Sequence, residues 1–353
     1  MAREFTLYWT SLEMYEACPQ KYLWSRGWGT LDVGGGPGRP KPLPVRDSGH
    51  HRMMGTAIGK VVEDFYNLEL WRDPKGLSDR LAERAEKEIL LELARGYVDY
   101  RVAPSKAEMV KICRDGVVGF LRTVKHDRLL GPYSRAEVNL MGRVDASTPV
   151  GGRADIIVTR EDTGTSILDG KNSQSKGKYT DPDQLRWYAM CFRLVHGRLP
   201  DRLGFVYFRY PADPDAGVSG VDWIPFTEGD ADGLAARAVA GLTGMKAERF
   251  DPTPSPKTCK FCDFETVCDA RQTQKANRAS RRSKGGDDDF PTGFVDLGFD
   301  SGGTGGGGNG GDGAAGSSGT ANTGGGGGGG GAQASGTGDG GSGGSGIVII
   351  SWS

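Results

Sequence analysis

A long glycine-rich segment near the C-terminus cannot contribute to a folded core. Residues 301–346 are mostly Gly, interspersed with Ser, Thr, Asn, Ala and Asp. Because this composition offers almost no apolar surface to bury, we expect the segment to be disordered or to act as a flexible spacer. The folded part should then comprise about 280 residues, which suits one large domain, and we assign it to residues 1–285.

Charged and apolar stretches border the glycine-rich segment, and we assign residues 286–353 to an acidic, then glycine-rich tail with an apolar tip. A basic stretch comes first and is followed by three aspartates. Its basic residues are Arg271, Lys275, Arg278, Arg281, Arg282 and Lys284. They could contact nucleic acid, with Arg271 and Lys275 as candidates, or form a solvated helix end. The final sequence, GIVIISWS, could add a strand to a protein partner's sheet or be an inert end.

The start of the chain and its cysteines favour a cytoplasmic protein. Arg3, Glu4 and Glu13 interrupt the apolar run that a signal peptide would need, and no apolar stretch approaches the length of a membrane span. In the cytoplasm the six cysteines would be metal ligands or buried thiols, and disulfides are not expected.

The hydrophobic pattern changes its period along the chain and predicts an α/β fold. A capping box at Thr10 and Glu13 predicts a first helix over residues 12–25, and residues 32–54 have the composition of a mobile loop. Helical spacing predicts helices at 55–72, 77–100, 105–129, 181–196 and 230–248. Alternation predicts strands at 136–141, 152–159, 165–171, 203–209 and 220–225. The order indicates a helical part at about 55–130, then a mixed-sheet core at about 135–250, with a hairpin turn at 161–164.

Three charged residues fall at strand ends in this scheme. In ILDGKNSQSK, Asp169 and Lys171 are two positions apart on a strand, so their side chains share one face. If the two strands around the hairpin turn pair, Asp155 in GGRADIIV meets Asp169 at the same sheet end. Two such carboxylates repel unless a cation lies between them, and hard oxygen ligands suit Mg²⁺ or Mn²⁺. With Lys171 beside the metal, the set suits metal-assisted hydrolysis of a phosphodiester, although a structural salt bridge also explains it.

The helix that follows can extend this site. Gln184 and Tyr188 in DQLRWYAMCF are one turn apart and so lie on one helix face. They could present an amide and a phenol to a phosphate backbone. Alternatively, Gln184 is merely exposed and Tyr188 belongs to the core.

Four cysteines form a second candidate site. Cys259, Cys262 and Cys268 are spaced C-x2-C-x5-C, and Cys18 stands far upstream. Three clustered thiolates and a remote fourth can hold a [4Fe–4S] cluster or Zn²⁺, and the lack of a second C-x2-C pair favours iron–sulfur. Such a site would join the first helix to the end of the domain, because metal binding is coupled to folding. Cys113 and Cys191 lie in apolar helical contexts and are expected in the core.

Between about residues 7 and 270, the chain carries six short motifs whose identity and order resemble those of the PD-(D/E)XK nuclease superfamily. They are Cys-Pro, G-T-A-I-x-x-x-x-E, G-R-x-D, D-x-K, Q-x-x-x-Y and C-x2-C-x5-C. They are most similar to the RecB/AddB-type branch with an iron–sulfur clasp, which includes CRISPR-associated adaptation exonucleases. The resemblance implies a restriction-endonuclease-like mixed sheet flanked by helices, with a helical insertion and a four-cysteine clasp.

The resemblance also implies a role for each matching residue. Asp155, Asp169 and the Gly170 carbonyl would bind Mg²⁺ or Mn²⁺, and Lys171 would be the catalytic lysine. Gln184 and Tyr188 would act near the DNA, and Glu137 matches a glutamate on the preceding strand. The cluster ligands would be Cys18, Cys259, Cys262 and Cys268.

One position departs from the family pattern. Family members usually have a metal-binding histidine where this chain has Gly59 in MGTAIGKVVEDFY. Glu63 is one turn further along the same helix face and could add an oxygen ligand. His50 and His51, expected in the preceding loop, could also approach. Some members of the superfamily work without this histidine.

The function expected from the resemblance is metal-dependent DNA exonuclease activity, on single-stranded or end-containing DNA. The setting would be recombination, repair or phage DNA processing in a bacterial or phage-infected host cytoplasm, with a helicase or recombination protein as partner. Two alternatives stay open. One is a weakly active or inactive DNA-binding scaffold of the same fold, and the other is a zinc-stabilised interaction protein.

Overall fold

A computed structural model describes residues 5–27, 49–173, 175–177, 180–260, 262–284, 332–333 and 336–337, and for residues 278–284 and the last two pairs it describes the backbone alone. The chain divides into two compact units, Met1–Arg278 and Ala279–Ser353. In the second unit, β7 (Ala332–Gln333) pairs antiparallel with β8 (Gly336–Thr337), within the segment for which we expected no structure. The apolar tip and most of the glycine-rich segment lie outside the described residues.

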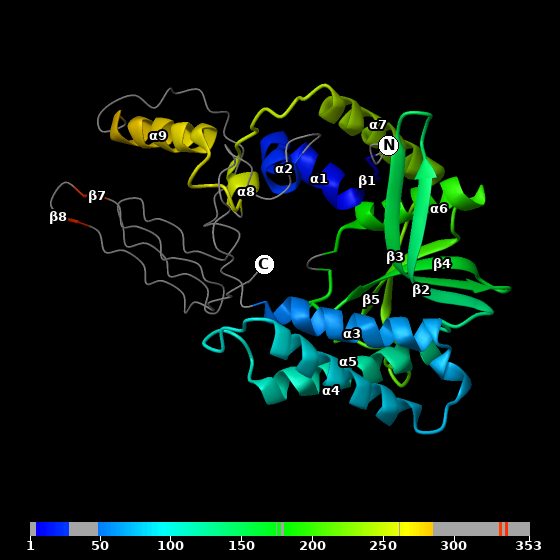
Figure 1. The fold of residues 1–353 in the computed structure, drawn as a ribbon. Coiled ribbons are helices and arrows are strands. Elements are labelled where there is room, and N and C mark those ends of the chain that lie inside the picture. The colour runs from blue at the N-terminus through cyan, green and yellow to red at the C-terminus, as the bar shows by residue number, and fades with distance from the viewer. Residues whose placement is uncertain are drawn as a thin grey trace. The chain divides into compact units, whose positions relative to one another are not determined.

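A six-stranded mixed sheet is the centre of the first unit (Figure 1). Its strands are β1 (Leu7–Tyr8), β2 (Tyr133–Arg143), β3 (Pro149–Arg160), β4 (Gly164–Lys171), β5 (Arg202–Tyr207) and β6 (Val221–Ile224). β2, β3 and β4 form an antiparallel meander, β5 is parallel to β4, and β6 closes the edge antiparallel to β5. The predicted hairpin turn is confirmed, and Gly164 begins β4 there with a φ of 69°.

The long strand β3 has two different neighbours along one edge. β1 pairs with it in parallel at Val150 and Gly151, whereas β4 pairs with it from Ile156 onward. Between these two contacts the edge at residues 152–155 has no strand partner among the described residues. The sheet therefore forks directly beside Asp155. A two-residue strand such as β1 is too short to show a hydrophobic period, and the sequence did not predict it.

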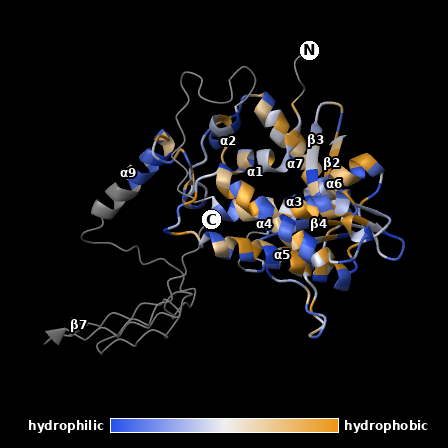
Figure 2. Cartoon of the chain, turned by 60° about the horizontal axis from the view of Figure 1, so that its bottom comes forward, coloured by the Kyte–Doolittle hydropathy of each residue, from blue (hydrophilic) through white to orange (hydrophobic). Residues whose placement is uncertain are grey.

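Helices cover both faces of the sheet (Figure 1). On one face lie α3 (His50–Asn67), α4 (Leu77–Arg95) and α5 (Lys106–His126), with the 3₁₀ turn Leu70–Arg72. On the other lie α1 (Trp9–Ala17), α6 (Pro182–His196) and α7 (Glu228–Lys246). α4 and α5 carry apolar residues beside polar ones, as amphipathic packing requires (Figure 2). The expected α/β architecture with a mixed sheet flanked by helices is confirmed.

Two predictions about the N-terminal half are wrong. The expected single first helix is two helices, α1 and α2 (Pro19–Arg26), because Pro19 forces Cys18 into an extended conformation with φ −164° and ψ 106°. α1 begins after Tyr8, without a side-chain cap, so the capping box of Thr10 and Glu13 does not form. α3 begins at His50, which places both histidines in a helix and not in a loop.

The remaining helices complete the C-terminal part of the domain. α8 (Pro256–Cys259) starts with a capping box between Ser255 and Thr258, and α9 (Asp269–Lys284) follows the last cysteine. No helix in the described ranges combines the length and the apolar character of a membrane span.

Candidate functional site

Three acidic residues occupy one row across three neighbouring strands. The β2–β3 register pairs Ala136 with Ile156 and Val138 with Ala154, which sets Glu137 opposite Asp155. The β3–β4 register begins at Ile156 and Leu168, which sets Asp155 opposite Asp169. Opposite residues on adjacent strands have Cβ atoms only about 5 Å apart. The hairpin thus brings Asp155 and Asp169 together, as the sequence predicted.

Asp155 lies at the fork of the sheet and replaces part of the backbone pairing there. Its Oδ2 accepts a hydrogen bond from the Gly170 amide at 3.0 Å. This contact fixes the carboxylate against the end of β4, next to the carbonyl that the resemblance assigns to the metal.

The lysine of the motif faces Asp169. Lys171 Nζ is 2.5 Å from Asp169 Oδ2, and it lies 5.6 Å from the centre of the Phe205 ring. Asp169 is buried, with 3% of its surface exposed. Its Oδ2 has this ion pair but no regular hydrogen bond within the described residues. The carboxylate therefore retains capacity to accept a further ligand.

Burial makes this carboxylate pair costly to ionise. Burial, and then the neighbouring charge of Asp169, raises the pKa of Asp155 to about 7. Burial also raises the pKa of Asp169, although Lys171 opposes that effect. A divalent cation would offset the repulsion and replace the proton, so the donor set fits Mg²⁺ or Mn²⁺.

A cavity of about 430 Å³ lies between α3 and this end of the sheet. Asp155, Gly170, Glu137 and, across from them on α3, Glu63 and Gly59 line it. Glu137 has a φ of 56°, which is rare for a residue with a side chain, and it pairs with Arg153 at 2.7 Å. Burial raises the pKa of Glu137, whereas Glu63 is paired with Lys60 at 2.9 Å.

The other predicted residues lie around this cavity in different ways. Asp169 and Lys171 do not line it, whereas Gly170 and Asn172, which alternate with them at the end of β4, do. His50 and His51 do not line it either, and His50 is buried at the start of α3. No group of three or more His, Cys, Asp or Glu side chains is arranged around a metal position in the described parts of the chain.

The helix α6 brings Gln184 and Tyr188 together on one face, as predicted. Gln184 Nε2 donates a hydrogen bond to the Tyr188 hydroxyl at 3.0 Å. The Tyr188 ring is buried, and burial, followed by the charge of Asp155, raises the pKa of its hydroxyl. The phenol is therefore both a core side chain and a neighbour of the carboxylates.

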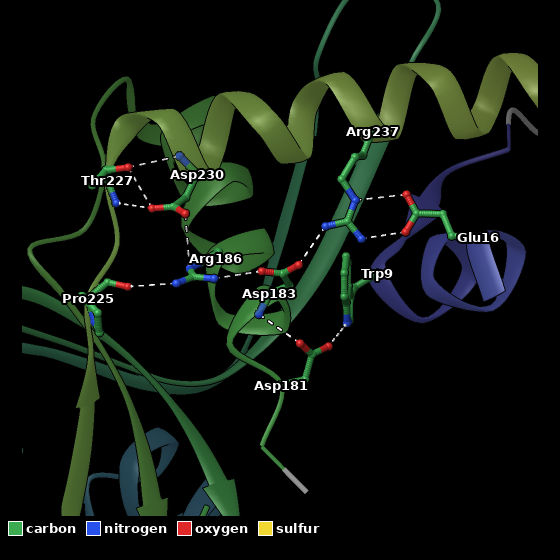
Figure 3. Close-up of polar contacts among 9 residues, drawn as sticks. All are labelled: Trp9, Glu16, Asp181, Asp183, Arg186, Pro225, Thr227, Asp230 and Arg237. Carbon is green, nitrogen blue, oxygen red and sulfur yellow. Dashed lines mark hydrogen bonds and ion pairs between the residues drawn. The ribbon is translucent and has the colours of Figure 1, made fainter. Parts of the chain in front are cut away.

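A polar network fixes the start of α6 (Figure 3). Asp181 caps the helix, and its second oxygen accepts a bond from Trp9 Nε1 at 2.8 Å. Arg237 on α7 bridges Asp183 at 2.8 Å and Glu16 on α1 at 2.6 Å. α1, α6 and α7 are thereby joined at Asp183, which directly precedes Gln184.

The four predicted cluster cysteines line one cavity. Cys18 lines this cavity from the break between α1 and α2. The C-terminal segment contributes the other three lining cysteines, Cys259, Cys262 and Cys268. Cys268 Sγ is 3.5 Å from Gln20 Oε1, and burial raises the pKa of Cys262. The four thiols fit a metal or cluster by chemical type, although they are not closed around a metal position here.

The structure also places the two candidate nucleic-acid-binding residues and the two cysteines outside the proposed cluster. Arg271 lines the same cavity, and both Arg271 and Lys275 pair with Glu265, at 3.2 and 3.0 Å. Their charges are thus already partly neutralised. Cys113 and Cys191 are buried, and burial raises the pKa of each thiol to about 12, as expected for core residues.

Sequence reasoning missed several residues that line the carboxylate cavity. They are Thr56, Lys60, Arg153, Asn172 and Phe208. Asn172 could have been found, since it directly follows Lys171 at the end of β4. Phe208 could not, because its position depends on the parallel pairing of β5 with β4.

Comparisons with known proteins bear on this arrangement. A family model described as the PD-(D/E)XK nuclease superfamily matches residues 9–269, and a glycine-rich domain model matches residues 239–353. No curated protein matches. The chain is similar to the solved structure of SSO0001, with 16% identity over 62% of this chain and 97% of that chain and a TM-score of 0.28. A similarity at that TM-score supports no conclusion.

Proposed function

Because this chain belongs to the PD-(D/E)XK nuclease superfamily, we propose that it is a metal-dependent DNA exonuclease acting on single-stranded or end-containing DNA. The observation that supports this most is that Asp155 and Asp169 lie opposite each other at the sheet fork, one residue beyond the paired Ile156 and Leu168, with Lys171 ion-paired to Asp169. A salt bridge alone would not explain why the half-buried carboxylate of Asp155 faces the buried carboxylate of Asp169.

Each residue has a distinct part in the proposed reaction. Asp155, Asp169 and the Gly170 carbonyl would hold Mg²⁺ or Mn²⁺, with Glu63 as a further candidate ligand. The ion would supply Lewis-acid activation of the scissile phosphate and of water. Lys171 would orient the attacking water and offset the negative charge that develops on the phosphate. Gln184 would contact the strand, while Tyr188 holds its amide in place.

Cleavage of end-labelled DNA tests this function. Wild-type protein with Mg²⁺ or Mn²⁺ should shorten single-stranded or end-containing DNA, and Lys171→Met should lower the rate by about 10²–10⁴-fold. Lys111→Met, at an exposed lysine paired with Asp115 on α5, is the control and should cut normally. Equal rates for Lys171→Met and wild type would contradict the assignment.

A second candidate is a DNA-binding scaffold without cleavage, and Gly59 favours it because the usual histidine ligand is missing. A Cβ atom placed at Gly59 meets no heavy atom within 4 Å, so the position has room for a side chain. We therefore expect Gly59→His to tighten Mn²⁺ binding roughly tenfold, which corresponds to about 1.4 kcal/mol.

Gly59→Ala is the matched control for that substitution. Alanine, like histidine, has a higher helix propensity than glycine, but it brings no ligand. Isothermal titration with Mn²⁺ measures the difference. If the histidine and alanine variants bind Mn²⁺ equally, Gly59 does not occupy the position of the missing ligand.

We further propose that Cys18, Cys259, Cys262 and Cys268 hold a structural [4Fe–4S] cluster. Their common cavity and the resemblance to the RecB/AddB-type branch support this, and Zn²⁺ is the alternative occupant. The same resemblance supports a role in recombination, repair or phage DNA processing beside a helicase or recombination partner. The β-branched composition of the tail tip supports a protein partner for residues 347–353.

A further inference from the structure

Two buried donor groups beside the carboxylate cavity have no acceptor. Asn172 lines the cavity at the end of β4, and its Nδ2 is buried without a hydrogen-bond partner within the described residues. Arg209, two residues after β5, donates from Nε to Asn172 Oδ1 at 3.2 Å. The Nη2 atom of Arg209 is likewise buried and unpartnered there.

The orientation of the Asn172 amide follows from its neighbour. A guanidinium can only donate hydrogen bonds, so the amide atom that faces Arg209 must be the oxygen. The NH₂ group of Asn172 is then the end left without an acceptor. Native proteins rarely leave buried donors unpaired, and such groups call for an explanation.

Arg209 is also an unneutralised charge. No carboxylate forms an ion pair with it within the described residues, and burial lowers the pKa of its guanidinium. The neighbouring thiol of Cys113 has a pKa of about 12 because it is buried, so it supplies no negative charge at neutral pH. By contrast, the two cations that line the cavity, Lys60 and Arg153, are already paired with Glu63 and Glu137.

We propose that Asn172 and Arg209 form a contact site for a phosphate group of the nucleic-acid strand in this cavity. Asn172 donates a hydrogen bond to the phosphate, and Arg209 holds the amide and supplies the positive charge. A water molecule would satisfy the amide but would not neutralise the guanidinium, whereas a phosphate does both. This inference rests on the proposed function. A nucleic-acid strand that enters a cavity lined by the carboxylates of Asp155 and Glu137 needs a positive charge to offset their repulsion of its phosphates.

The test is binding of end-labelled single-stranded DNA, without divalent metal, by the full chain carrying Asp155→Asn to prevent cleavage. In that background Arg209→Met should weaken binding about tenfold and reduce the slope of log K against log salt by about one. Arg209→Lys should keep the salt slope, because it keeps the charge. The melting temperature of Arg209→Met should be unchanged or higher, because an unpaired buried charge is removed.

Arg193→Met is the matched control. Arg193 is a part-buried arginine on α6, paired with Asp232 at 2.7 Å, and its loss should leave DNA affinity and salt slope unchanged. The inference is overturned if Arg209→Met binds DNA with unchanged affinity and slope, or if only its melting temperature falls. Cleavage by the chain with Asp155 intact, measured in parallel, tests the proposed function separately, since binding that depends on Arg209 does not require cleavage.

Discussion

Asp155→Asn should abolish DNA cleavage and, at pH 8, make the metal-free protein more stable. The pKa of Asp155 is about 7 in the folded chain, above the ordinary aspartate value of 3.8. Between these values the folded state holds a proton that the unfolded state has lost. The free energy of unfolding therefore falls as pH rises through that window, and asparagine removes this cost. We expect a gain on the order of 2–4 kcal/mol at pH 8, or roughly 5–10 °C in melting temperature.

Thermal melts at pH 4 and pH 8, with and without Mg²⁺, measure this effect. The variant should melt above wild type at pH 8 and near it at pH 4, where the wild-type carboxyl is protonated. Mg²⁺ should raise the melting temperature of wild type at pH 8 and should not raise that of Asp155→Asn. Asp162→Asn is the control, because arginines lower the pKa of that exposed carboxyl and its loss should give no gain at pH 8. A variant that melts below wild type at both pH values would show that Asp155 acts as a structural hydrogen-bond acceptor for the Gly170 amide and not as a metal ligand.

If the proposed cluster is present, Cys18→Ser should remove most of the iron from anaerobically purified protein and lower its melting temperature by more than about 10 °C, because the cluster would contribute several kcal/mol to folding. Cys18 is the one member of the cysteine set that lies outside the segment 259–268, so its loss separates the N-terminal helices from the clasp. Iron content, visible absorbance and a thermal melt report on the two effects.

Cys191→Ala is the control for that experiment. It removes a buried core thiol, which should cost some stability without changing the iron content. If wild-type protein contains zinc and no iron, the four cysteines bind Zn²⁺, the alternative occupant, and not an iron–sulfur cluster. If wild-type protein contains neither metal after anaerobic purification, the clasp proposal is wrong.

The core of the candidate site could be predicted because it depends on local geometry. Strand alternation puts Asp169 and Lys171 on one face, and a short hairpin fixes Asp155 opposite Asp169. Features that depend on distant pairing could not be predicted in this way. The fork at residues 152–155 requires a two-residue strand from the N-terminus, and the contact of Arg209 with Asn172 requires the parallel pairing of β4 with β5. The break at Cys18 was in principle readable from Pro19, but the apolar residues on both sides suggested one continuous helix.

The bridge from Glu16 through Arg237 to Asp183 joins the start of the domain to a part that is synthesised much later. Glu16 and Arg237 are separated by 221 residues, so the contact between α1 and α7 can form only after almost the whole domain has been synthesised. Contacts between such distant residues form slowly, and a chain leaves the ribosome from its N-terminus. A nascent chain can form the β3–β4 hairpin with its two carboxylates long before α6 is anchored. We therefore expect α1 to reach its final position on α6 and α7 late in translation, once α7 has left the ribosome.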